Sequence, residues 1–247
     1  MSKPVIMNPI QPLNIEETPC EDITSVIFDN EDFQVIRSIG DSRFPILIVF
    51  SKKHNQNVAM KLFKHVDDMP SKAYLNEIRF SSLNHSNIVK ILGYEDHYHA
   101  PYDDEPGVCS YLLMELGFCD LNHIMNEIDI EDDETLARTF FHQIVNGLEY
   151  LHSNGFAHLD LKPENLLLGQ DFELKITDFD MSYQTGDICT VGKGTPYYRA
   201  PEVAKRKCKK PKAADIYSIG IILFILKFGQ LPYDERRLQS WDMICSN

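Results

Sequence analysis

The spacing of the hydrophobic residues changes partway along the chain, and this change limits the possible folds more than any other feature. Three short apolar runs, at 33–36, 46–50 and 58–63, are rich in β-branched and aromatic residues and favour strands. Farther on, apolar residues recur every three or four positions, as on one face of a long helix. They are Leu136, Phe140, Ile144, Leu148 and Leu151. A sheet-rich first part followed by a helical second part is therefore expected.

Local signals extend this outline in the first part. The polar stretch 52–57 suits a hairpin turn, and Pro70-Ser71 offers a helix start. Apolar runs at 88–92 and 111–116 predict two more strands, joined by a polar loop that contains 103–107. The first part should therefore hold five strands and one helix.

In the second part, end signals frame the two predicted helices. Acidic residues at 131–134 stand where the helix dipole favours them, and Asn154-Gly155 supplies a stop for the long helix. A second helix is expected from about Ala214 to Phe228, ending at Gly229.

Composition excludes several classes of protein. The net charge of −13 argues against non-specific nucleic-acid binding, and the basic run 205–212 is interpreted as a solvated loop. The longest apolar stretch, 219–226, is far shorter than the ~20 residues of a membrane span. Six scattered cysteines and no leader-like N-terminus indicate a cytoplasmic protein with reduced thiols. Residues 1–30, rich in Pro, Asn and acidic side chains, are expected to form a flexible extension.

The most informative motif runs from His158 to Asn165 and reads HLDLKPEN. A carboxylate such as Asp160 can orient a hydroxyl and take its proton. Lys162 can balance the charge of a phosphoryl group in transfer, and Asn165 offers magnesium an oxygen ligand. This stretch resembles the catalytic loop of protein kinases.

Other motifs of that family follow in its order from Phe33 to about Asn247. Val58–Lys61 resembles the strand motif whose lysine contacts the α and β phosphates, and Glu77 would be the ion-pair partner of that lysine. Asp178-Phe179-Asp180 resembles the Asp-Phe-Gly metal motif, so that Asp178 and Asn165 would bind Mg²⁺. Two further matches are Ala200-Pro201-Glu202, which closes the activation segment, and 215–220, a buried helix that anchors the catalytic loop.

The resemblance also implies a nucleotide site and a substrate class. Gly40 would begin the glycine-rich phosphate loop, Met114 would be the gatekeeper, and Asp120 would reach the ribose. The adenine would lie between Ile39, Leu47, Ala59 and Leu167, with backbone groups from Glu115 and Leu116. Lys162 and the segment 194–199 resemble Ser/Thr kinases, in which Thr195 would bond Asp160 and Lys162.

Some positions depart from the family pattern. Ser42 and Pro45 stand where the phosphate loop has glycine, and Pro45 has no amide to donate. Leu159 replaces the Arg that pairs with a phosphorylated activation segment, which suggests activity without that contact. Asp180 replaces the Gly of the metal motif. These changes keep two alternatives open, a pseudokinase or scaffold that retains the fold without turnover, and a fragment of a longer kinase.

The expected fold is therefore α+β and bilobal, as in protein kinases. It comprises an extension (1–30), a small antiparallel sheet lobe with one helix (31–115) and a mainly helical lobe (116–247) that looks incomplete at its C-terminal end. The expected activity is transfer of the γ-phosphoryl group from ATP, with Mg²⁺, to protein Ser or Thr hydroxyls. The expected partners are ATP and a protein substrate, with no nucleic acid and no membrane, and the sequence does not indicate the oligomeric state.

Overall fold

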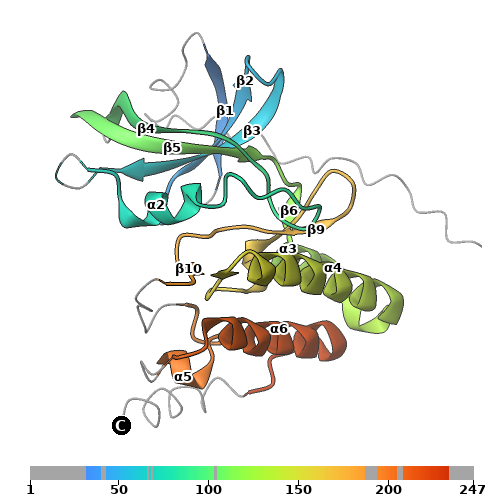
Figure 1. Ribbon diagram of the computed structural model, residues 1–247. Coiled ribbons are helices and arrows are strands. Elements are labelled where there is room, and N and C mark those ends of the chain that lie inside the picture. Colours follow the sequence, from blue (N-terminus) through green and yellow to red (C-terminus); the bar gives the residue numbers. More distant parts are fainter. Residues whose placement is uncertain are drawn as a thin grey trace, which may run out of the picture.

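A twisted antiparallel sheet lies against a group of helices (Figure 1). The computed structural model describes residues 32–39, 43–65, 67, 69–102, 105–186, 194–204 and 208–233. The order of the strands in the sheet is β1-β2-β3-β5-β4. Their bounds are β1 Phe33–Ile39, β2 Ile46–Ser51, β3 Gln56–Lys64, β4 Ile91–Tyr102 and β5 Glu105–Glu115. The five predicted strands are confirmed.

The helix of the sheet part is α2 (Lys72–Ile78), and it begins at the predicted place. The Ser71 hydroxyl caps it by accepting the amide hydrogen of Tyr74 at 3.2 Å. Asn76 and Glu77 are buried on this short helix. Its packing therefore determines where these two polar side chains lie.

The hairpin between β2 and β3 sets the register of the sheet. Ser51 pairs with Gln56, so the turn holds four residues, and Asn55 takes a left-handed conformation (φ 52°) that suits its side chain. Because residues directly opposite each other share a face, Ile46 lies beside Lys61 and Leu47 lies beside Met60 on the other face.

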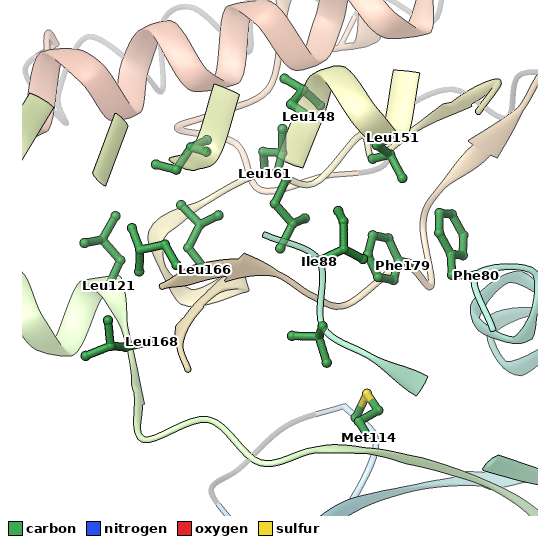
Figure 2. Packing of buried hydrophobic residues seen from close by; sticks show 14 of the residues in the cluster. Phe80, Ile88, Met114, Leu121, Leu148, Leu151, Leu161, Leu166, Leu168 and Phe179 are labelled. Carbon is green, nitrogen blue, oxygen red and sulfur yellow. The ribbon is translucent and has the colours of Figure 1, made fainter. Parts of the chain in front are cut away.

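The two faces of the sheet are packed differently. One face forms a separate cluster with Phe33, Leu47, Met60 and Leu62. The opposite face, with Ala59 and the residues around it, joins the main core that continues into the helical part. Figure 2 shows part of this core, which draws residues from both parts of the chain.

The hairpin of β4 and β5 is longer than predicted. The loop expected to contain 103–107 is shorter, because Glu105–Gly107 already belong to β5. The apolar runs at 88–92 and 111–116 mark only the buried ends of these strands, while Tyr94 and its neighbours up to His97 are exposed. The parts of these strands that lie outside the core need no apolar alternation, so the sequence pattern does not predict their full length.

The second part is mainly helical. Its α-helices are α3 (Leu121–Glu127), α4 (Glu134–Ser153), α5 (Pro201–Ala204) and α6 (Pro211–Phe228). Two short 3₁₀ helices also occur, η1 (Ile130–Asp132) and η2 (Pro163–Asn165). Two small sheets join the loops, namely β6 (Cys119–Asp120) with β8 (Leu166–Leu168) and β9 (Leu174–Ile176), and β7 (Phe156–Ala157) with β10 (Tyr183–Gln184). The α+β class and the order of sheet and helices are confirmed, whereas α3 was not predicted.

The two long helices end where the sequence predicts. Asp133 caps α4 by accepting the amide hydrogens of Thr135 and Leu136, each at 3.0 Å. Gly155 follows α4 with φ 85°, and Gly229 ends α6 with φ 65°, a left-handed conformation that favours glycine. The helix α6 begins three residues earlier than expected, because Pro211 fits the first turn.

A face of α6 remains uncovered among the described residues. Ile216, Leu223 and Phe228 are each 44–56% exposed. Glu202, in the short helix α5, is half-buried. No helix in the described part of the chain is long and apolar enough to cross a membrane.

Candidate active site

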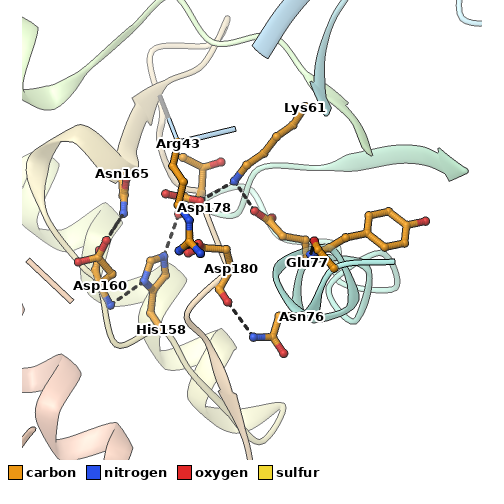
Figure 3. A network of polar contacts seen from close by, with 12 residues as sticks. Arg43, Lys61, Asn76, Glu77, His158, Asp160, Asn165, Asp178 and Asp180 are labelled. Carbon is orange, nitrogen blue, oxygen red and sulfur yellow. Dashed lines mark hydrogen bonds and ion pairs between the residues drawn. The ribbon is translucent and has the colours of Figure 1, made fainter. Parts of the chain in front are cut away.

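Lys61 of β3 lies at the centre of a buried polar network (Figure 3). Its ammonium group donates to Glu77 Oε1 at 2.5 Å and to Asp178 Oδ1 at 2.6 Å. The predicted ion pair of Lys61 with Glu77 is therefore present, and Asp178 joins it from 117 positions away in the sequence. Side chains from β3, α2 and the segment after β9 meet at this point.

Burial and mutual attraction act in opposite directions in this network. Burial alone would lower the pKa of Lys61, but the charges of Glu77 and Asp178 raise it above its ordinary value. Burial raises the pKa of Glu77 in spite of Lys61. Burial also disfavours ionised Asp178, yet Lys61 holds the pKa of Asp178 below its ordinary value. The Asp178 carboxylate thus stays charged and is 34% exposed, where a cation could reach it.

Asp160 is 5% exposed and is held by several neighbours. Its Oδ1 accepts the amide hydrogen of Thr195 at 2.6 Å and the hydroxyl hydrogen of Thr195 at 2.9 Å. Its Oδ2 lies 3.5 Å from the ammonium of Lys162. The predicted bond between Thr195 and Asp160 is present, but among the described residues no bond joins Thr195 to Lys162. Oδ2 also accepts from the side-chain nitrogen of Asn165 at 3.4 Å, so both of its contacts are longer than those of Oδ1, and it is the more weakly held oxygen of Asp160.

Asn165 is fixed by the loop that it closes. Its side-chain nitrogen Nδ2 donates to the backbone carbonyl of Asp160 at 2.8 Å, and its backbone carbonyl accepts the amide hydrogen of Thr177 at 3.1 Å. Since the side-chain nitrogen is engaged, the Oδ1 atom is the group that Asn165 can offer to a cation. The Thr177 contact also holds Asn165 close to the segment that carries Asp178.

A buried carboxylate on α6 anchors the loop that carries Asp160 and Asn165. Asp215 of α6 is fully buried, and it accepts the amide hydrogens of His158 at 2.9 Å and Leu159 at 2.8 Å. A ring nitrogen of His152 lies 2.8 Å from the same carboxylate. Leu159 takes φ 67°, a conformation that costs a non-glycine residue about 1–3 kcal/mol. The anchoring that the sequence indicated for this helix is confirmed.

His158 is a packed residue and not a proton acceptor for a substrate. It is fully buried, and its ring lies 5.3 Å from that of Phe179. The Nε2 atom donates to the Thr177 carbonyl at 2.8 Å, while Nδ1 accepts the amide hydrogen of Asp160 at 3.2 Å. Both ring nitrogens are thereby occupied, which gives His158 a structural role.

The segment 178–180 joins the two parts of the molecule. Asp178 takes φ 65°, and Phe179 stacks on Phe80 with ring centroids 4.0 Å apart. The Asp180 carbonyl accepts from the buried Asn76 of α2 at 2.7 Å. Asp180 does not share the left-handed conformation, so this position does not require the family's glycine.

The expected adenine residues fall into two groups. Ala59 lies opposite Met114 on the face that joins the main core, and Leu167 packs against the same core. Ile39 lies opposite Ile46, also on this face, but Leu47 points to the other side, where it is 1% exposed. The placement of Leu47 corrects the expectation, and Ile46 takes its place. Gly40 lies outside the described residues.

The register explains this correction. Counting back from Lys61 through the four-residue turn puts Ile46 on the same face as Lys61, and Leu47 on the opposite face beside Met60.

At the junction of the two parts, backbone groups are only partly available. The Glu115 amide donates to the Lys90 carbonyl at 3.0 Å, so Glu115 can offer its carbonyl but not its amide. The next residue, Leu116, is half-buried against the core. Asp120 accepts the amide hydrogen of His123 at 2.8 Å and so caps α3, which leaves one carboxylate oxygen for other contacts.

The oxygen donors at this site suit magnesium. Mg²⁺ is usually held by one or two protein oxygens together with phosphates and water, rather than by a complete protein cage. Asp178 and Asn165 supply oxygens of this kind. Among the described residues no cluster of three or more His, Cys, Asp or Glu side chains could hold a metal by itself.

Sequence reasoning missed three residues at this site. They are Arg43, Asn76 and Ile46. Strand register could have found Ile46, but nothing in the sequence indicates that Asn76 bonds Asp180 across 104 positions. No sequence pattern indicates Arg43 either, because its partner Asp180 becomes a neighbour only in the folded chain.

Comparison with known proteins agrees with this geometry. The chain is 48% identical over 108 residues to CBL-interacting serine/threonine-protein kinase 8 of Arabidopsis thaliana, which covers 42% of this chain and 24% of that protein. It is 34% identical over 212 residues to probable serine/threonine-protein kinase MARK-A of Dictyostelium discoideum, and the match covers 82% of this chain and 19% of that protein. It is 30% identical over 217 residues to maternal embryonic leucine zipper kinase of Danio rerio, and the match covers 82% of this chain and 30% of that protein.

These relatives are longer proteins, and the chain spans only about a fifth to a third of their length. The protein kinase domain model matches residues 33–246, which is most of the chain. The ordered motifs, the buried lysine network and the match all agree. The chain belongs to the protein kinase family.

Proposed function

We propose that this chain is an ATP-dependent protein kinase that phosphorylates Ser or Thr hydroxyls of other proteins. The observation that supports the proposal most is that the ammonium group of Lys61 donates hydrogen bonds to both Glu77 and Asp178. This contact brings the sheet, α2 and the metal motif into one arrangement. Asp160 is held separately by Thr195 and by the anchored loop.

Asp160 is the proposed base. Its more weakly held oxygen, Oδ2, would accept the proton of the substrate hydroxyl while the hydroxyl oxygen forms a bond to the γ-phosphorus. The bond between the γ-phosphorus and the β,γ-bridging oxygen breaks, and ADP leaves. Lys162, 3.5 Å from Oδ2, would stabilise negative charge on the phosphoryl group in transfer.

The remaining residues position the nucleotide and its cation. Lys61 would contact the α and β phosphates, and the Oδ1 of Asn165 and the carboxylate of Asp178 would bind Mg²⁺, whose charge offsets that of the phosphates. Ile39, Ile46, Ala59, Met114 and Leu167 would enclose the adenine, near the carbonyl of Glu115. Catalysis on this arrangement is mainly positioning and electrostatic stabilisation.

The test is transfer of radiolabelled phosphate from Mg-ATP to a general basic protein. The native chain should incorporate label into Ser or Thr, and Asp160→Asn should reduce the rate at least a hundredfold. Phosphoamino-acid analysis that returned only phosphotyrosine would contradict the substrate class. A native chain that binds Mg-ATP but transfers no label would contradict the activity.

A pseudokinase is the second candidate, and two observations favour it. Pro45 lacks the amide hydrogen that a glycine would offer to phosphates, and its carbonyl is bonded to the Leu62 amide at 2.9 Å. Asp180 adds a negative charge beside Asp178. Thermal shift with Mg-ATP separates the candidates only together with the transfer assay. A nucleotide binder gains about 2.7 kcal/mol at a hundredfold excess over Kd whether or not it transfers phosphate, so stabilisation without transfer would indicate a pseudokinase.

A further inference from the structure

Arg43 and Asp180 form an ion pair at the edge of the proposed site. The guanidinium NH1 lies 3.7 Å from Asp180 Oδ2. Arg43 comes from the segment between β1 and β2, and Asp180 follows the metal-binding carboxylate Asp178. Figure 3 shows Arg43 and Asp180 together in the polar network that also contains Lys61 and Asp178. A residue of the phosphate loop therefore meets Asp180, the position at which the metal motif departs from the family pattern.

Arg43 and Lys61 contact the same aromatic ring. The Arg43 guanidinium lies 5.0 Å from the centre of the Phe44 ring, and the Lys61 ammonium lies 5.3 Å from the same centre. Phe44 in turn packs on Phe63, with centroids 4.8 Å apart. Phe44 is thus fixed against the core, and its ring attracts both cations.

The two partners of the ion pair are unequal. The Arg43 side chain is 70% exposed, so it can change its direction, whereas the Asp180 side chain is 7% exposed and fixed. Burial and the nearby charge of Asp178 raise the pKa of Asp180, so the carboxylate is in an unfavourable environment. With its partners 3.7 Å apart and the Arg43 side chain 70% exposed, the pair contributes little to stability. Its position next to the phosphate-binding residues points to a different role.

We propose that Arg43 binds the phosphates of the nucleotide and that Asp180 holds its guanidinium in place before the nucleotide enters. This inference rests on the proposed function. Arg43 would supply charged N–H donors where Ser42 and Pro45 replace glycines, and guanidinium groups match phosphate oxygens in a two-pronged geometry. The phosphates would displace the Asp180 carboxylate, because they offer more charge and more acceptor oxygens.

The experiment measures Kd by calorimetry for Mg-ADP, Mg-ATP and adenosine. Arg43→Ala should weaken both nucleotides about tenfold or more, as expected for loss of a hydrogen bond between charged groups, and leave adenosine unchanged. Arg43→Lys should keep part of the affinity. Lys53→Ala is the matched control, because Lys53 is an exposed cation in the turn between β2 and β3. It should leave all three values within twofold.

A double-mutant cycle tests the part played by Asp180. Asp180→Asn should change Mg-ADP affinity by a different factor in the native background than in the Arg43→Ala background. Equal factors would overturn the counter-ion role. Equal Kd values for native protein and Arg43→Ala would overturn the phosphate role, and a parallel loss of adenosine binding would do the same.

The two proposals fail in different ways. If the native chain binds adenosine and Mg-ADP but Arg43→Ala binds them equally well, only the role of Arg43 is wrong. If the native chain binds none of the three ligands, the proposed function itself is wrong, and the inference falls with it. The melting temperature of ligand-free Arg43→Ala should be close to the native value, since the guanidinium is 70% exposed and lies 3.7 Å from the carboxylate.

Discussion

Replacing Lys61 with methionine tests the physical basis of the site. Methionine keeps the length of the side chain but removes the cation from between two carboxylates. Glu77 is only 1% exposed, so water cannot replace the lost partner. Asp178 is 34% exposed and can recover part of its solvation. The main cost therefore comes from Glu77.

The size of this cost follows from the burial. Removing one partner of a buried ion pair costs about 3–5 kcal/mol, because an uncompensated charge remains. A domain of this size is stable by about 5–15 kcal/mol, so the variant should still fold at room temperature with clearly reduced stability. Nucleotide binding should weaken as well, but stability alone tests the argument about burial.

The cost should also depend on pH. Burial already raises the pKa of Glu77 above its ordinary value, and loss of Lys61 raises it further. When the pKa of a carboxyl group is higher in the folded state than in the unfolded state, protonation stabilises the fold. The free energy of unfolding then falls as pH rises from the unfolded pKa of about 4.3 through the folded value. Lys61→Met should therefore be least destabilising at acid pH. Between pH 6 and pH 8 the penalty should grow by up to about 2–3 kcal/mol, which is one proton over two pH units.

Urea denaturation of the native chain and the variant at pH 6 and pH 8 measures both effects. The double variant Lys61→Met with Glu77→Gln is the control, since a neutral amide removes the stranded charge. It should be more stable than Lys61→Met at pH 8, and its penalty should be nearly independent of pH. A penalty for Lys61→Met that is below 1 kcal/mol, or is the same at both pH values, would refute the reasoning.

Three further changes have expected outcomes. Asp160→Asn should retain the far-UV circular dichroism of the native chain while losing phosphate transfer, and any residual rate above one per cent would argue against Asp160 as base. Asp215→Ala leaves two buried backbone donors and the half-buried His152 ring without their acceptor and should lower the free energy of unfolding by about 3–5 kcal/mol, measured by urea denaturation. Gly229→Ala should destabilise by about 1–2 kcal/mol, because its backbone is left-handed and the new methyl group would collide with the Glu131 carboxylate; an unchanged melting temperature would contradict this.

The sequence determined the elements that depend on short-range patterns. The spacing from Phe140 to Leu151 and the glycines 155 and 229 located the long helices, because amphipathic periodicity and left-handed end positions are local properties. The motif 158–165 likewise predicts the proposed chemistry, because it brings a carboxylate, a cation and a possible oxygen ligand into one loop.

Only the tertiary structure decided which distant residues meet. Asp178 and Glu77 reach Lys61 because β3, α2 and the segment after β9 share one core. The register of the β2–β3 hairpin exchanged Leu47 for Ile46, since a shift of one residue moves a side chain to the other face. Arg43 gained its place from the packing of Phe44 and from Asp180. These contacts join positions far apart in the chain, and no local pattern records the distance between them.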